Sequence, residues 1–347
     1  MFCRQAGRRP VISLVLPRVP LELKAALVVA AVALYAYGLA AHPTAVGTVG
    51  SVLDPATADV LRREGGASAD GDVHCGIGVV ASPAASPGTG PSYGPVGEGD
   101  VPWALAAPRR LTDLQEKLGA RRLVAAFRIA FRNPLWDEAY NVATGARYLA
   151  GTVVRPGETA SLYRIIGPFS RERGYRDGPG YAGGRIVPTV AGGICKISSA
   201  LYNLLIHSGV PVVERHPHSM PVPYIPPGRD ATIAAGYKDL RFRNDTDSPL
   251  LFWAAVEDGA LYVALYGDFE APRVTWYQEE LARQPTWTVR RTSSALAPGQ
   301  ERVVIEGHDG VTVRTWVTVT RAGEAPRRLH LGVDTYRPLP RVVEVGT

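Results

Sequence analysis

The chain has 347 residues, of which 46% are hydrophobic, and a formal net charge of +6. This length allows two domains with appendages, and the hydrophobic content is ordinary for a globular protein. Five basic residues and one acidic residue precede position 25, so the first segment alone carries +4 of the charge. The remainder is close to neutral, and we therefore expect no nucleic-acid partner.

The basic segment, residues 1–24, is followed by an uncharged apolar run over residues 25–41. A membrane-spanning helix needs about 20 apolar residues, and this run is at the short end of the range. Basic residues on its N-terminal side predict that the rest of the chain is exported. An uncleaved membrane anchor and a cleaved signal peptide both fit the pattern. We therefore expect the protein at the cell membrane, held there by this segment, or secreted if the segment is cleaved.

Residues 42–108 differ in composition from the segments on either side. Between residues 81 and 95 the sequence is rich in Pro, Gly, Ser and Ala and has no hydrophobic period. Such a segment buries too little apolar surface to offset the entropy of ordering, which predicts a linker or stalk. This stretch contains Cys75, and a disulfide between Cys75 and Cys195 stays open as an alternative in an exported protein.

A folded domain is predicted over residues 109–270. Apolar spacing predicts helices over 111–130 and 134–149, and residues 151–158 read as a short strand that ends in a Pro-Gly turn. The next helix is drawn more clearly, because the apolar residues that follow Ile194 recur at intervals of three and four. Gly209 predicts its end.

The clearest chemical signal is a cysteine at the start of this helix. Gly192 and Gly193 allow a sharp turn there and a close approach to a bound group. The unpaired N–H groups of a first helical turn favour a thiolate over a thiol and can donate to an oxyanion. Ser198 and Tyr202 share a helix face with Cys195, which makes them candidate substrate contacts.

Two histidines follow on the predicted next strand, where a period of two puts His216 and His218 on one face. A histidine that reaches Cys195 would act as general base, and Asp230 or Asp239 would fix its tautomer. Zinc bound by the two histidines and the thiolate is the other functional interpretation, but Cys195 lacks a C-x-x-C partner. Our prediction therefore includes no metal and no cofactor.

Residues 285–347 are predicted to form a separate β module. Segments 302–306, 311–320 and 341–345 are strand-like, and the second of them alternates with a period of two. The fold class predicted for the whole chain is α+β: a mixed helix and antiparallel-sheet domain, a small all-β C-terminal module and an N-terminal membrane helix.

The chain resembles the VanW family, which is named for an accessory protein of glycopeptide-resistance clusters. The resemblance covers about residues 133–267. It includes several ordered blocks: Gly192-Gly193-x-Cys195, Glu214-Arg215-His216-x-His218-Ser219, Gly228-Arg229-Asp230-Ala231-Thr232 and Asp239-Leu240-x-Phe242-x-Asn244. It implies an exported bacterial protein of the cell wall, since some VanW domains are implicated as L,D-transpeptidases. Residues 334–347 are similar to the close of a G-five domain, a β module thought to adhere to amino-sugar polymers.

The resemblance implies that peptidoglycan is the partner and that Cys195 is the nucleophile. Cys195 would attack the carbonyl of the third residue of a tetrapeptide stem, release the terminal D-amino acid and pass the acyl group to another stem. His218 is the first choice for the base and His216 the second, with Asp230 as the carboxylate. The C-terminal module would bind glycan strands. The alternative is a non-catalytic peptidoglycan-binding or glycopeptide-resistance accessory protein.

Three further positions follow from the same comparison. Arg215 or Arg229 could hold a substrate carboxylate through a bidentate contact. Lys196 stands where the family usually has Gln, and a positive charge there could stabilise a neighbouring thiolate.

Overall fold

The computed structural model describes residues 80–81, 93–131, 134, 137–182 and 185–347. The chain divides into two compact units, Met1–His74 and Cys75–Thr347, and the fold described here belongs to the second. The predicted membrane segment, residues 25–41, lies outside the described residues, and so does Cys75. Within the described part of the chain, no helix is both long and apolar enough to cross a membrane.

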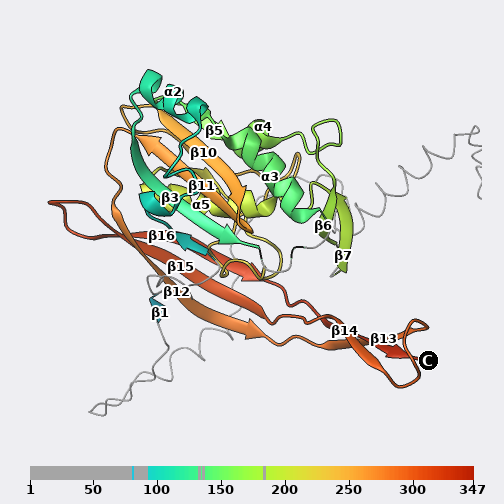
Figure 1. Ribbon diagram of the computed structural model, residues 1–347. Helices are drawn as coiled ribbons and strands as arrows, with labels where there is room; N and C mark the ends of the chain where they lie inside the picture. Colours follow the sequence, from blue (N-terminus) through green and yellow to red (C-terminus); the bar gives the residue numbers. More distant parts are fainter. Residues whose placement is uncertain (1–79, 82–92, 132–133, 135–136, 183–184) are drawn as a thin grey trace, which may run out of the picture. The chain divides into compact units, whose positions relative to one another are not determined.

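A five-stranded antiparallel sheet forms the centre of the first domain (Figure 1). Its strands, in spatial order, are β2 (Tyr93–Pro95), β3 (Arg122–Ala130), β11 (Ala260–Gly267), β10 (Leu250–Glu257) and β4 (Thr152–Val154). The register of β3 on β11 sets Phe127 opposite Val263. The middle of the sheet is therefore completed only when two segments far apart in the sequence meet.

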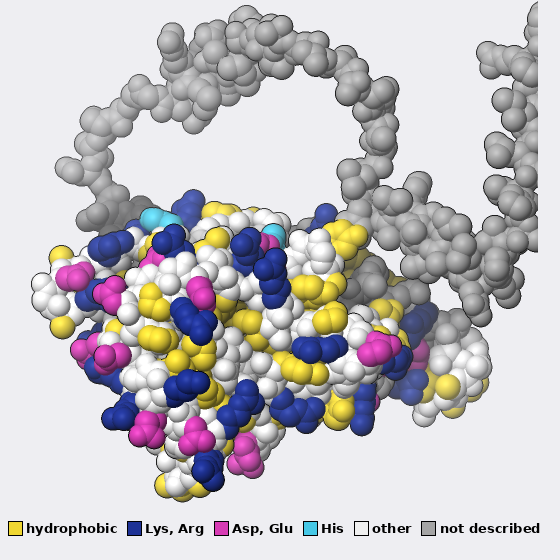
Figure 2. Space-filling view, turned by 90° about the horizontal axis from the view of Figure 1, so that it is seen from above, with side chains coloured by type: hydrophobic (Ala, Val, Ile, Leu, Met, Phe, Trp, Pro, Cys, Tyr) yellow, Lys and Arg dark blue, Asp and Glu magenta, His cyan; other side chains and the backbone are white. Residues whose placement is uncertain are grey.

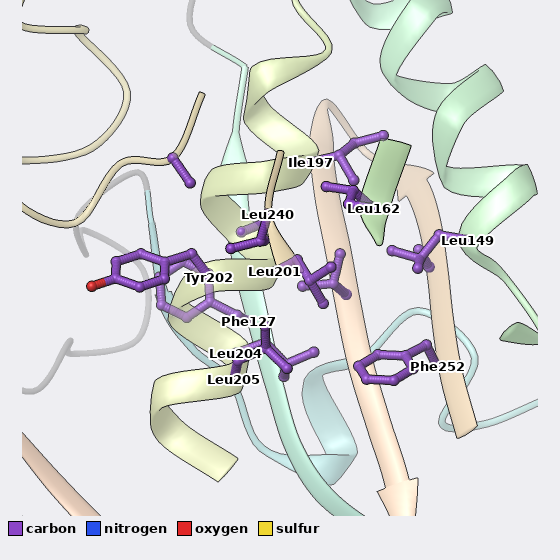
Figure 3. Close-up of a cluster of buried hydrophobic side chains, with 14 of the residues drawn as sticks. Phe127, Leu149, Leu162, Ile197, Leu201, Tyr202, Leu204, Leu205, Leu240 and Phe252 are labelled. Carbon is purple, nitrogen blue, oxygen red and sulfur yellow. The ribbon is translucent and has the colours of Figure 1, made fainter. Parts of the chain in front are cut away.

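Both faces of this sheet are covered. Helices α3 (Glu138–Leu149) and α5 (Cys195–Ser208) pack on one face, and α2 (Arg109–Leu118) contacts β10 as well. Neighbouring residues of one strand enter different clusters: Phe252 packs with the α3 and α5 side chains, whereas Trp253 packs with Leu111 of α2. Figure 3 shows the larger cluster, where Leu201 and Leu204 of α5 lie between Phe127 and Phe252. The alternation follows from the period of two along a strand.

Two of the local predictions upstream of this core are wrong. The single helix predicted over 111–130 is α2 followed by the strand β3, with Gly119 in the left-handed conformation (φ +69°) at the end of the helix. The predicted linker ends earlier than residue 108, because Val101 and Trp103 are buried in the cluster under α2. The Trp103 indole donates a hydrogen bond to the Tyr266 hydroxyl (2.7 Å), which ties this segment to β11.

The prediction for the helix that begins at Cys195 is confirmed. α5 runs over Cys195–Ser208 and ends at Gly209, which has φ +73°. Its apolar stripe is buried against β3 and β11, as Ile197, Leu201 and Leu204 all lack solvent exposure. A left-handed glycine at this position leaves the last helical carbonyls within reach of following N–H groups, here those of Gly209 and Val210.

Small elements surround the start of α5. Strands β5 (Thr159–Ser161), β9 (Arg241–Arg243) and β8 (Val212–Glu214) form a three-stranded sheet, and α4 (Leu162–Ile166) follows β5 directly. Strands β6 (Asp177–Ala182) and β7 (Arg185–Val190) form a hairpin that leads into the turn before α5.

The C-terminal region is all β. One sheet has the order β1 (Val80–Ala81), β12 (Arg273–Gln284), β15 (Gly310–Thr320), β16 (Arg327–Tyr336), and the other β13 (Thr288–Ser293), β17 (Arg341–Gly346), β14 (Glu301–Ile305). The three predicted strands correspond to β14, β15 and β17. Strand β12 begins twelve residues before the predicted start of the module at 285. Mixed sheets, few helices and an all-β C-terminal region make the fold α+β, as predicted.

Candidate functional site

Cys195 occupies the first position of α5, after a tight backbone turn. Ala191 (φ 61°) and Gly193 (φ +93°) are both left-handed. A Cβ on Gly192 would overlap the backbone of Gly178 on β6. The two glycines thus allow the sharp turn that was predicted, but the group that approaches Gly192 closely is the chain itself and not a ligand.

Buried Asn141 on α3 fixes this turn. Its amide nitrogen donates to the carbonyls of Gly192 (3.0 Å) and Arg176 (2.9 Å), and its amide oxygen accepts from the Arg176 N–H (2.8 Å). Three backbone groups depend on this one buried side chain, and one of them, the Gly192 carbonyl, is itself buried, so the turn ahead of Cys195 is tied to α3.

Cys195, His218 and Asp230 form a hydrogen-bonded chain. On one side the His218 imidazole interacts with the Cys195 thiol, and each group shifts the pKa of the other. On the other side its Nδ1 lies 2.5 Å from Asp230 Oδ2, which also accepts the His218 backbone N–H at 2.7 Å. Cys195 is a partly exposed free thiol, and its Sγ lies 3.7 Å from the Ile233 carbonyl oxygen. The order nucleophile, imidazole, carboxylate is that of a catalytic triad.

The charges of Cys195, His218 and Asp230 stabilise one another. Burial raises the pKa of the Cys195 thiol, but the hydrogen bond and charge of His218 outweigh it and hold the pKa below its ordinary value. Burial lowers the pKa of His218, yet bonds to Asp230 and Cys195 raise it to about 9. Burial likewise raises the pKa of Asp230, and the bond and charge of His218 bring it below its usual range. These interactions favour a thiolate beside an imidazolium over the neutral pair.

The structure separates the two histidines that the sequence placed on one face. The chain leaves β8 at Glu214 and is irregular beyond it, so the period of two does not continue. His216 Nε2 lies 2.9 Å from a Glu214 carboxylate oxygen, and only His218 bonds the thiol. The other candidate carboxylate, Asp239, accepts from the Ser161 hydroxyl and the Tyr163 N–H at the start of α4.

Both arginines that the sequence suggested for a substrate carboxylate have partners inside the fold. Arg215 is buried and donates to Asp230, through Nη2 to the carboxylate (3.0 Å) and through Nε to the carbonyl (2.7 Å). Arg229 is also buried, donates to Asn203 Oδ1 (2.9 Å) and lies over the Trp276 ring. Burial lowers the pKa of Arg229 to about 10. Both guanidinium groups are used inside the fold.

The two candidate contacts on α5 are buried as well. The Ser198 hydroxyl donates to the Ala231 carbonyl (2.6 Å), and Tyr202 packs under the Arg215 guanidinium. They hold the segment around Asp230 against α5 and do not line a substrate site.

Lys196 has a partner that sequence reasoning missed. Its ammonium pairs with the Glu138 carboxylate of α3, and both side chains are nearly buried, at 8% and 12% exposure. The ammonium also lies 4.5 Å from the centre of the Tyr224 ring. Lys196 therefore neutralises Glu138, and the charges that chiefly shift the pKa of Cys195 are those of His218 and Asp230.

Two further residues of the site come from the C-terminal sheet and were not predicted. The Tyr336 hydroxyl donates to Asp230 Oδ1, and Asp334 Oδ2 pairs with Arg215 Nη1 (2.5 Å). Both lie on β16, more than a hundred residues after Asp230 in the sequence. No local pattern connects them to the cysteine.

An open pocket of about 430 Å³ lies along the segment that follows Ile233. Its lining is mostly polar and includes Ser161, Glu214, Ala234, Lys238 and Arg241. On the face drawn in Figure 2, Lys and Arg are interspersed with Asp and Glu. Among the residues that the structure describes, no group of three His, Cys, Asp or Glu side chains could hold a metal ion.

Comparison with known proteins agrees with the two regions of the fold. Residues 137–266 match the family described as VanW like protein, and residues 277–347 match the G5 (G-five) domain. The chain carries a VanW-like domain followed by a G5 domain. All of Cys195, His218 and Asp230 lie in the VanW-like domain, and Asp334 and Tyr336 lie in the G5 domain.

Two curated proteins share the VanW-like region. The uncharacterized protein YoaR of Bacillus subtilis (strain 168) is 37% identical over 130 residues, covering 38% of this chain and 43% of that protein. The vancomycin B-type resistance protein VanW of Enterococcus faecalis (strain ATCC 700802 / V583) is 30% identical over 137 residues, covering 38% of this chain and 50% of that protein. The chain thus spans about half the length of these relatives or less.

One solved structure, described as IgA1 Protease G5 domain structure, is 27% identical to this chain. It covers 23% of this chain and 98% of its own, with a TM-score of 0.15.

Proposed function

We propose that this protein acts at the bacterial cell wall, where Cys195 transfers acyl groups between peptidoglycan stem peptides in an L,D-transpeptidase-type reaction. The VanW-like and G5 domains, with the similarity to a protein named for vancomycin resistance, support a cell-wall-associated or glycopeptide-resistance-related protein. The observation that carries the catalytic part is the bonded chain of Cys195, His218 and Asp230. Export by the N-terminal apolar segment is part of the proposal.

In the proposed reaction Cys195, His218 and Asp230 each have a role. The Cys195 thiolate attacks the carbonyl carbon of the third stem residue and forms a tetrahedral intermediate. His218 gives its proton to the nitrogen of the departing D-amino acid, which leaves a thioester on Cys195. An amine of a second stem attacks this thioester, His218 takes up the amine proton, and the thiolate departs as the new amide forms. Asp230 keeps the imidazole in one orientation throughout.

The turn before α5 provides a donor for the intermediate. The backbone N–H groups of Lys196 and Ile197 already bond carbonyls of the turn, at 3.1 and 2.9 Å. That of Cys195 has no hydrogen-bond partner among the described residues. In the proposed reaction this N–H donates to the oxyanion, so the predicted set of donors is reduced to the nucleophile's own amide.

The pocket beyond Ile233 is the proposed site for the rest of the stem peptide. Its lining includes Ala234, the residue after the carbonyl that contacts the Cys195 sulfur. Lys238 and Arg241 in its lining offer positive charge to peptide carboxylates. In this proposal they replace Arg215 and Arg229 as the groups that hold a substrate carboxylate.

The test uses the full chain with disaccharide-tetrapeptide muropeptides and follows products by mass spectrometry. Wild type should release the terminal D-alanine and form cross-linked dimers, and Cys195→Ala and His218→Gln should form neither. Cys75→Ala is the matched control, because it removes a thiol to which the proposal gives no role. If the wild type and Cys195→Ala both retain muropeptide and neither turns it over, the catalytic proposal fails and a wall-binding accessory protein remains.

A further inference from the structure

We propose that the G5 domain is part of the catalytic centre, in which Tyr336 and Asp334 of β16 are positioning residues that act on Cys195 through Asp230, Arg215 and His218. The inference rests on the proposed function to the extent that it treats Asp230 as the carboxylate of the triad. It assigns the module a role besides binding to the wall.

Tyr336 completes the set of donors around the Asp230 carboxylate. Oδ2 accepts the ring and backbone N–H groups of His218, and Oδ1 accepts Arg215 Nη2 and the Tyr336 hydroxyl. The same hydroxyl accepts the Gly228 N–H at 2.6 Å, and Tyr336 is 2% exposed. Two donors on each oxygen fix the carboxylate plane. Without the hydroxyl, Oδ1 keeps one donor, and the carboxylate plane is held less firmly.

Asp334 holds the guanidinium that supports the same carboxylate. Arg215 Nη1 pairs with Asp334, while Nη2 and Nε donate to Asp230. The planar guanidinium is therefore held by residues of both the VanW-like and the G5 domain. A guanidinium needs such fixed partners to keep a defined orientation when it is buried. If Asp334 loses its charge, Arg215 has only Asp230 as a charged partner. The stronger pull of Arg215 would then weaken the hold of Asp230 on His218.

The G5 sheet also contacts the backbone segment just before Asp230. The Gln278 amide on β12 donates to the Pro227 carbonyl, and Trp276 on the same strand packs on Arg229. Gly228 has φ +81°, and a Cβ there would overlap the Thr315 hydroxyl on β15. Three neighbouring strands of the G5 sheet therefore touch consecutive residues of one loop. The position of Asp230 therefore depends on how that sheet packs against the loop.

The experiment measures how fast iodoacetamide alkylates Cys195 between pH 5 and 10. Mass spectrometry of the peptide that contains Cys195 separates its signal from Cys3 and Cys75 in the full chain. The variants are Tyr336→Phe and Asp334→Asn, with Asp230→Asn as the reference for a broken triad. Tyr277→Phe is the matched control, because it makes the same chemical change on the same sheet while its ring stacks on Trp316.

We expect the rate at pH 7 to fall about tenfold in Tyr336→Phe and in Asp334→Asn, which is the scale of one hydrogen bond to an ionised group. The midpoint of the profile should move to higher pH and the rates should converge above it, because only the thiolate fraction has changed. Tyr277→Phe should follow wild type. Profiles of Tyr336→Phe and Asp334→Asn that match wild type, while that of Asp230→Asn does not, would overturn the inference.

Thermal unfolding of each variant separates a change in the positioning of Asp230 from loss of the fold. Tyr336→Phe keeps the ring and its packing, so a midpoint shift in a protein that unfolds at the wild-type temperature is a positioning effect. Alkylation does not require a wall substrate. A wild-type chain that fails to turn over muropeptides but shows these shifts would refute the proposed reaction and leave this inference intact.

Discussion

Replacement of Lys196 by Met tests the inference that the positive charge of Lys196 neutralises the Glu138 carboxylate. Met keeps the length of the side chain and its apolar packing but removes the ammonium, which leaves the nearly buried Glu138 carboxylate without its cation. Loss of one partner of a buried pair destabilises a protein by about 3–5 kcal/mol. Because Glu138 keeps 12% of its exposure, we take the lower end, about 3 kcal/mol, or roughly a hundredfold in the folding equilibrium.

Urea unfolding followed by tryptophan fluorescence at pH 7 gives the free energy, and a double-mutant cycle assigns it to the pair. Glu138→Leu alone should also be destabilising, whereas Lys196→Met combined with Glu138→Leu should lose less than the two single changes together. Folded Lys196→Met should keep the alkylation profile of Cys195. A loss below about 1 kcal/mol, additive single effects, or a shifted profile would each refute this reasoning.

Three other predictions concern the core and the charges around the site. Asn141→Ala should reduce the free energy of unfolding by about 2 kcal/mol, since three backbone groups lose a partner and one of them, the Gly192 carbonyl, is buried; a urea titration that shows no loss would contradict this. Burial and the charge of Arg229 lower the pKa of His207 to about 4. The unfolded chain is thus protonated first, and about 3 kcal/mol of stability should disappear as pH falls from 6.5 towards 4. His207→Gln should flatten this slope in unfolding curves. His218 has a folded pKa of about 9, above its unfolded value, so its contribution is complete below pH 6.5 and is lost as pH rises through 9; Asp230→Asn should remove most of this alkaline loss.

Local sequence patterns correctly predicted those elements whose buried face follows from the spacing of their own apolar residues. The stripe on α5 and the glycine at its end were sufficient for that helix, and alternation was sufficient for β15. Residues 122–130 were assigned to a helix, because their apolar positions fit either period over so short a stretch. Their pairing with β11 decides for a strand, and that partner lies more than a hundred residues away.

The centre of the site was predictable in part. A cysteine after a glycine pair, with two histidines and an aspartate close behind, indicated the groups that the structure brings together. The pattern could not separate His216 from His218, because their roles are decided by which ring reaches Asp230. Arg215 was assigned to substrate since its partner Asp334 comes from another domain. Contacts between distant segments carry no signal in a single sequence.

The most direct test of the central claim is the mass of the Cys195 peptide after brief exposure of the full chain to a tetrapeptide muropeptide. The account predicts an added mass equal to the muropeptide less its terminal D-alanine, which disappears when an acceptor amine is supplied. It also predicts no adduct in His218→Gln at neutral pH. An unmodified Cys195 peptide under conditions in which iodoacetamide alkylates it rapidly would contradict the claim that this thiol carries the acyl group.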